Sequence, residues 1–206
     1  MKISYTTFMK HAEKVTKSAP DWRPVLKGVY HSEDGNLIVT DMHRLYFAKS
    51  AVPGKYPMVL DPKTGDQVDG TYPNIDHLIP DINNASAEIT FETKELLSGM
   101  NALLKCNQVD KNKQAYVELN MNGGNIPTIF VENSLMSSRF KSGYSYGNED
   151  VHLVFGTQYI IDALNLFKTC KIDKIKLRHY GSFRPFTITP DNSTNLLTLI
   201  SPIKHG

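Results

Sequence analysis

Long apolar runs are missing from this chain of 206 residues, and none approaches the roughly 18 residues that a membrane-spanning helix needs. The first residues, Met1 to Tyr5, lack the apolar stretch of a secretory signal, so we expect a cytoplasmic protein with no membrane partner. Cysteine is equally scarce. Cys106 and Cys170 stand far apart without the spacing of a metal or redox site, which predicts two buried thiols in a reducing compartment.

Motifs of catalysis are also missing. The chain contains no Walker A loop, GxGxxG, HExxH, nucleophile elbow or zinc-ligand spacing, so we expect neither a cofactor nor a metal. The strongest catalytic candidate is the pair Asp41 and His43, in which the carboxylate would orient a basic imidazole. Because no nucleophile lies nearby in the sequence, we expect both residues to serve a turn and the protein not to be an enzyme.

Charge is modest overall but unevenly distributed. The formal net charge is +2. Residues 2–27 carry six basic and two acidic residues, residues 168–184 carry six and one, and residues 50–92 carry two and seven. Such a pattern is typical of ordinary surface scatter, and it equally fits a protein with one cationic face for a polyanion.

What the chain does contain is an internal repeat. Residues 3–7, 89–93 and 153–157 share the pattern aliphatic, any, aromatic, any, Thr. Each alternation predicts a short strand, and each Thr predicts the N-cap of the amphipathic helix that follows. The predicted helices span residues 8–18, 94–106 and 158–169. One five-residue match is weak evidence for a repeat, but three matches, each followed by a predicted helix, indicate a true repeat.

Three strands are predicted after each helix, and two of the sets are joined by Gly- and Asn-rich hairpin turns. They cover residues 25–32, 37–40 and 44–49, then 115–121, 126–132 and 137–141, then 174–180, 186–189 and 196–200. Residues 53–88 are acidic and rich in turn residues, which favours a packed linker. We therefore expect an α+β fold of three βαβββ units, divided into residues 1–88 and 89–206.

Lysines follow one face of the first predicted helix and surround the end of the third. Lys10, Lys14 and Lys17 stand opposite Phe8 and Val15, at helical spacing. Lys168, Lys171 and Lys174 occupy the end of the third helix and the residues after it. A lysine stripe is usually a solvated face, but two such sets in one repeat protein favour contact with a polyanion.

Several segments resemble the bacterial sliding clamp, the beta subunit of DNA polymerase III. Residues 40–45, which read Thr-Asp-Met-His-Arg-Leu, are similar to the clamp motif Thr-Asp-Gly-His-Arg-Leu, the most specific of the matches. Residues 23–29, 72–80, 159–164 and 199–204 resemble a clamp strand, the interdomain stretch, the last-helix signature and the C-terminal tail. These segments follow the order of the middle and last clamp domains and span almost the whole chain.

The resemblance implies the DNA-clamp fold, here about one and a half clamp domains, with helices that face double-stranded DNA. It also implies a pocket that takes short hydrophobic peptides of DNA polymerase and other clamp-binding proteins, and a homo-oligomer. Carried over by position, the pocket residues are Leu26, Thr40, His43, Arg44, Leu45, Pro73, Leu78, Leu199, Pro202 and Ile203. The DNA-binding lysines are Lys10, Lys14, Lys17, Lys168, Lys171 and Lys174.

The chain also departs from the family pattern. Met42 stands where the motif has Gly, Ser201 where the tail has an apolar Met, and the first clamp domain has no counterpart. These departures predict a shortened relative, of a kind that a phage or mobile element would encode, with altered peptide affinity. Two functions follow: a processivity accessory that binds DNA and clamp-binding peptides, or a non-ring module that binds replication proteins or the host clamp.

Overall fold

The structure is a computed structural model that describes residues 3–54, 57–110, 115–145 and 149–203. It divides into two compact units. The first contains residues 1–80 together with residues 192–199, and the second contains residues 81–191 and 200–206. The predicted domain limits, 1–88 and 89–206, stay a prediction.

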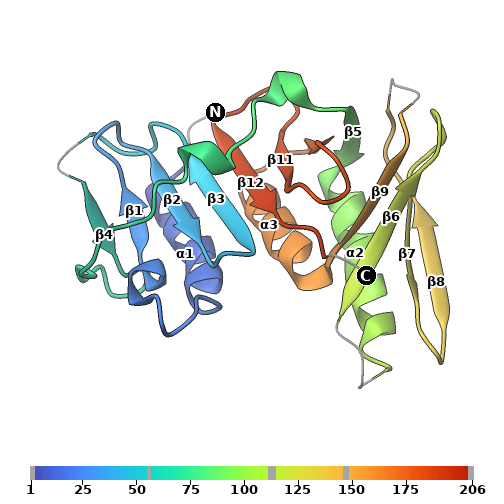
Figure 1. The fold of residues 1–206 in the computed structure, drawn as a ribbon, viewed down its shortest axis with the longest axis horizontal. Coiled ribbons are helices and arrows are strands. Elements are labelled where there is room, and N and C mark those ends of the chain that lie inside the picture. Colours follow the sequence, from blue (N-terminus) through green and yellow to red (C-terminus); the bar gives the residue numbers. More distant parts are fainter. Residues whose placement is uncertain (1–2, 55–56, 111–114, 146–148, 204–206) are drawn as a thin grey trace. The chain divides into compact units, whose positions relative to one another are not determined.

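The first unit is a sheet with one helix against it (Figure 1). Its strands are β1 (Val29–His31), β2 (Leu37–Thr40), β3 (Arg44–Ala48), β4 (Met58–Leu60) and β12 (Leu196–Ile200), in the order β4-β1-β2-β3-β12. Helix α1 (Tyr5–Thr16) buries Phe8, Ala12 and Val15 and leaves its lysines in solvent. The alternation of apolar and basic residues along α1 thus fixes which face packs on the sheet.

The second unit contains two successive repeats. The first repeat is β5 (Ala87–Glu92), α2 (Thr93–Asn107), β6 (Tyr116–Met121), β7 (Thr128–Glu132) and β8 (Ser137–Lys141). The second begins with β9 (Val151–Gly156), α3 (Thr157–Thr169), β10 (Lys174–His179) and β11 (Phe186–Pro190). The 3-10 helix η3 (Ile82–Asn84) precedes β5.

The two repeats exchange strands. β5 pairs antiparallel with β10 of the other repeat, from Glu92↔Lys174 to Ala87↔His179, and β9 pairs in the same way with β6. The first helical amides follow this symmetry, since Thr93 N–H donates to the Asp173 carbonyl (2.7 Å) and Thr157 N–H to the Ala115 carbonyl (3.0 Å). The repeats are therefore halves of one domain, with α2 packed on α3.

The repeat pattern predicts the helices correctly and two details wrongly. Of the residues that the structure describes before α1, Ile3 and Ser4, neither forms a strand. The helix begins at Tyr5, and its N-cap is Ser4, whose hydroxyl accepts the Thr7 N–H (3.1 Å). Thr93 and Thr157 are the first helical residues, not caps: the cap positions belong to Glu92 and Gly156, whose backbones are extended. The buried Thr157 hydroxyl instead accepts a hydrogen bond from the Asn107 side chain (3.1 Å).

The region around β1 and β4 differs from the prediction as well. Residues 24–27 form a 3-10 helix, η1 (Pro24–Lys27), so β1 begins only at Val29. Within the acidic linker, β4 adds to the edge of β1, with Tyr30↔Val59 in register. A three-residue strand beside several turn residues carries too little alternation to be recognised in the sequence.

Candidate functional site

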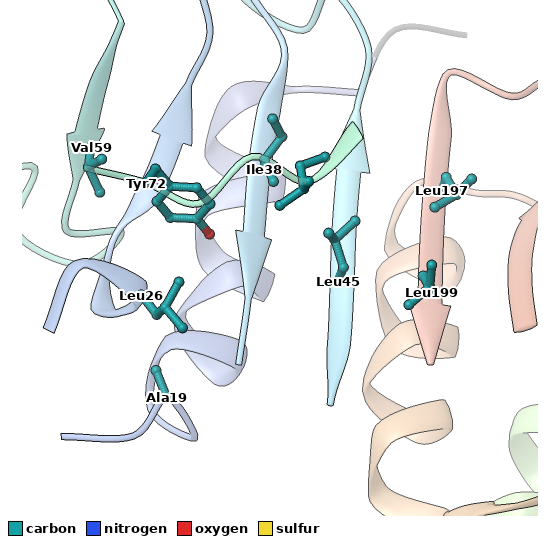
Figure 2. Packing of buried hydrophobic residues seen from close by; sticks show 9 residues of the cluster. Ala19, Leu26, Ile38, Leu45, Val59, Tyr72, Leu197 and Leu199 are labelled. Atoms are coloured by element: carbon teal, nitrogen blue, oxygen red, sulfur yellow. The ribbon is translucent and has the colours of Figure 1, made fainter. Parts of the chain in front are cut away.

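One apolar cluster of the first unit gathers segments that are far apart in the chain. Leu26 of η1, Leu45 of β3 and Leu199 of β12 are at most 5% exposed and belong to this cluster. Figure 2 shows them with the other members, Ala19, Ile38, Val59, Tyr72, Ile75 and Leu197. Three of the predicted pocket residues are therefore brought together, as the packed inner wall of the first unit.

The rim of this cluster is the turn between β2 and β3. The Thr40 hydroxyl donates to the Arg44 carbonyl (2.8 Å) and accepts the Met42 N–H (3.1 Å), while Thr40 N–H donates to the Tyr72 hydroxyl (3.1 Å). Burial raises the pKa of Tyr72, so its hydroxyl stays neutral. Thr40 thus stabilises the turn through its hydroxyl, and its backbone N–H bonds the turn to Tyr72, the residue before Pro73.

Asp41 organises the same turn with both of its carboxylate oxygens. Oδ1 accepts the backbone N–H groups of His43 (3.0 Å) and Arg44 (2.9 Å), and Oδ2 accepts Arg44 Nε (2.9 Å). Asp41 is 1% exposed, whereas the His43 side chain is exposed. These contacts give Asp41 the turn role expected from the sequence. They do not support the hydrolase alternative, in which the carboxylate would orient the His43 imidazole.

Arg44 links this turn to α1. Its Nη2 donates to the Lys14 carbonyl (3.1 Å) and to the Ser18 hydroxyl (3.3 Å), and the residue is 3% exposed. A cation beside a carbonyl of the last turn of a helix is favourable because the helix dipole is negative there. Arg44 therefore holds the turn against the end of α1. Its part in peptide contact stays a prediction.

The remaining predicted pocket residues differ in position. Leu78 ends η2 (Asp76–Leu78) and is 44% exposed, and Pro73 is half-buried. In this segment the apolar packing comes from Ile75, which is a member of the cluster, and from Ile79, which packs against it. The family motif does not single out either residue, although both lie close to Leu78 in the sequence. Pro202 and Ile203 belong to the second unit, where Ile203 N–H donates to the Val154 carbonyl of β9 (2.7 Å). Their convergence with the cluster stays a prediction.

The predicted DNA-binding lysines are exposed in both units. Lys17, the C-cap of α1, pairs with Glu13 one turn earlier (2.7 Å). Only Lys168 lies within α3; Lys171 follows it, and Lys174 opens β10, where it pairs with Glu92 (3.3 Å). The hydrogen bond from Lys174 to Glu92 raises the pKa of Lys174. Exposed pairs of this kind are weak, so both lysines are available to exchange a carboxylate for a phosphate.

Other chemistry is sparse in the part of the chain that the structure describes. Within it, no group of three or more His, Cys, Asp or Glu side chains could hold a metal ion, and no helix is long and apolar enough to span a membrane. Cys106 and Cys170 are free thiols. Both are half-buried, not buried as predicted, and burial raises the pKa of the Cys170 thiol.

Taken together, the strand-exchanged repeats and the helix-backed sheet define an α+β fold of the DNA-clamp class. The sliding clamp of Bacillus subtilis has this fold, with a TM-score of 0.80 and 21% identity over 98% of this chain and 63% of that one. The DNA polymerase III beta chain of Streptococcus pneumoniae gives 0.79 and 20% identity, over 100% of this chain and 67% of that one.

Sequence comparison confirms the resemblance. The beta sliding clamp of Lactococcus lactis is 25% identical over 139 residues, and that of Bacillus subtilis is 24% identical over 236 aligned positions. The chain spans 35% and 59% of these two relatives, respectively. No protein-family model matches it.

Proposed function

We propose that the chain is a sliding-clamp-like accessory of DNA replication, which binds short hydrophobic peptides of its partners and contacts duplex DNA through exposed lysines. The observation that carries the proposal is the turn of residues 40–45, whose motif residues frame an apolar cluster in a fold shared with beta clamps. Neither activity needs a catalytic group.

A peptide with apolar anchors suits this part of the first unit. The buried cluster supplies a packed floor, and the accessible apolar surface comes from half-buried side chains packed against it, among them Val25, Phe47 and Ile79. Leu78 adds an exposed side chain from the segment that carries Ile75. A short peptide that buries about 300 Å² of apolar surface gains several kcal/mol at about 25 cal/mol per Å². Ordering of the peptide offsets part of this gain, so we expect a Kd in the micromolar range.

Calorimetric titration of a clamp-binding pentapeptide tests the proposal. Leu45 is unsuitable as a probe, because truncation of a buried leucine costs about 2–5 kcal/mol of stability. Leu78→Ala removes an exposed side chain, and we expect it to weaken binding about fivefold, or about 1 kcal/mol. Ile82→Ala, at a similarly exposed aliphatic residue (38%) of η3, is the matched control and should bind as the wild type does.

The proposal fails if the wild type gives no heat with the peptide. Equal affinity of the wild type and Leu78→Ala would place the peptide elsewhere on the molecule.

A further inference from the structure

Trp22 is the single tryptophan of the chain, and it is 67% exposed. It lies on the loop between α1 and η1, where the guanidinium of Arg23 lies 5.0 Å from the centre of its ring. An indole this exposed contributes little to folding. A guanidinium over a tryptophan face is, in contrast, a favourable arrangement that keeps both planar groups oriented.

The loop holds this pair in place from both ends. Ala19 before it and Leu26 after it are buried in the apolar cluster of the first unit. Within the loop, Arg23 N–H donates to the Pro20 carbonyl (3.0 Å) and Leu26 N–H to the Arg23 carbonyl (3.0 Å). A binding partner would therefore meet a pre-ordered aromatic group, and little conformational entropy would be lost on contact.

The charge around the loop identifies the kind of partner. Residues 10–27 contain five basic side chains and two acidic ones. One of the acids, Asp21, is hydrogen-bonded to Lys27, which lowers the pKa of that carboxyl, and the other, Glu13, pairs with Lys17. An exposed aromatic face among cations matches a nucleobase with its phosphates better than it matches an apolar peptide.

We propose that Trp22 and Arg23 form a stacking site for an unpaired base of single-stranded DNA. The site rests on the proposed contact with DNA and adds to it a second kind of contact. The lysines attract phosphates of any strand, whereas the indole stacks only on a base that has left the duplex. Such a site would favour DNA with a single-stranded segment over a blunt duplex.

The second unit offers a natural control for this site. Phe183, Arg184 and Pro185 repeat the order aromatic, Arg, Pro, and Phe183 is 68% exposed. It lies in the other unit, where Arg178 pairs with Glu88 (2.6 Å) and both act on Tyr180, three residues before Phe183. Removing Phe183 therefore removes an equally exposed ring that is also followed by an arginine, but at a different place in the molecule.

Fluorescence of the protein tests the site directly, because Trp22 is the only indole. Titration with single-stranded oligothymidylate at low salt should quench the emission to saturation, and a blunt duplex should quench it less. With a labelled oligothymidylate, Trp22→Leu should lower the affinity about tenfold. Arg23→Lys, which keeps the charge and loses the planar group, should also lower it, and Phe183→Leu should bind as the wild type does.

Salt dependence separates stacking from simple charge attraction. Trp22→Leu should leave the slope of log affinity against log salt unchanged, whereas Lys14→Glu should reduce it by about 0.7 for each phosphate that the variant no longer neutralises. No quenching, or equal affinity of Trp22→Leu and wild type, overturns the stacking site. Quenching by the clamp-binding pentapeptide and not by DNA would assign the loop to a protein partner, and also overturns it. The calorimetric peptide titration decides the proposed function independently.

Discussion

At the scale of single residues, Met42 is the clearest departure from the clamp motif. It adopts φ 78° in the turn between β2 and β3, a left-handed conformation that favours glycine, which is the residue that the family motif has there. A side chain in this region costs roughly 1–2 kcal/mol. Met42 is 46% exposed, so its side chain regains little of this by packing.

Met42→Gly should therefore stabilise the protein. The relief of strain exceeds the extra backbone entropy that glycine loses on folding, and the expected net gain is about 0.5–1 kcal/mol. Urea unfolding measures it. Met42→Ala is the control, since alanine keeps the strain and should leave the stability near that of the wild type. Equal gains from both substitutions would contradict the strain argument.

His31 gives the first unit a dependence on pH. Its Nδ1 donates to the Val29 carbonyl (3.0 Å), which leaves Nε2 to accept from the Tyr5 hydroxyl (3.2 Å). Burial lowers the pKa of His31, so the unfolded chain binds its proton more readily than the folded one does. Stability from this residue is present above the unfolded pKa of about 6.5 and is lost as the pH falls through the lower folded pKa.

The expected result is a smaller free energy of unfolding at pH 5 than at pH 7.5. His31→Gln should reduce this difference, because glutamine does not titrate. Part of the difference between pH 5 and pH 7.5 should remain in the variant, because burial also lowers the pKa of His179. An unchanged pH dependence in His31→Gln would show that His31 is protonated equally in both states.

At the scale of elements, Gly99 explains how α2 meets β8. A methyl group at Gly99 would lie 2.4–2.7 Å from the ring of Phe140, so glycine in this helix permits the close approach of the strand. Glycine within a helix ordinarily costs about 1 kcal/mol relative to alanine. Gly99→Ala should nevertheless destabilise the protein by about 1–3 kcal/mol, because the overpacking outweighs the gain in helix propensity.

Urea unfolding of a double-mutant cycle tests this contact. Gly99→Ala in the background of Phe140→Ala should be neutral or stabilising, since the ring that blocks the methyl group is gone. A destabilisation of the same size in both backgrounds would mean that the strand contact is not the cause.

How far the sequence predicts these elements depends on the range of the interactions that form them. Strands β2, β8 and β12 match their predicted limits, because local alternation and turn residues determine them. The sequence pattern misses β4, because the stability of that strand comes from pairing with β1. It places the caps of α2 and α3 one residue too far along the chain, because Glu92 and Gly156, the last residues of β5 and β9, hold the cap positions. At the site, the motif locates the turn, but only the fold shows that Arg44 is buried against α1.

At the scale of the whole molecule, edge strands bear on assembly. Two edge strands make further backbone contacts: Leu60 of β4 forms a bridge with Gln67, and Val154 of β9 accepts a hydrogen bond from the Ile203 N–H. β8 ends its sheet, beyond β7, with alternate residues exposed. Any edge strand presents unpaired backbone N–H and C=O groups that another chain can pair with, although β8 is short and its Arg139 and Lys141 are exposed.

Light scattering should therefore detect a homo-oligomer whose population grows with protein concentration. A closed dimer or trimer supports the processivity role. A monomer at every concentration would contradict this prediction and favour the non-ring interaction module.

The first unit is assembled from two stretches of chain, since residues 192–199 lie in it although 111 residues of the second unit separate them from Pro80. A ribosome adds about 5–20 residues each second, so the neighbouring strand β12 is synthesised on the order of ten seconds after β3. During this interval Leu45 lacks Leu197 and Leu199, and the motif turn sits beside an unfinished sheet. Residues 1–80 are thus synthesised well before the residues that complete their unit, and part of the apolar cluster is exposed in nascent chains during this interval.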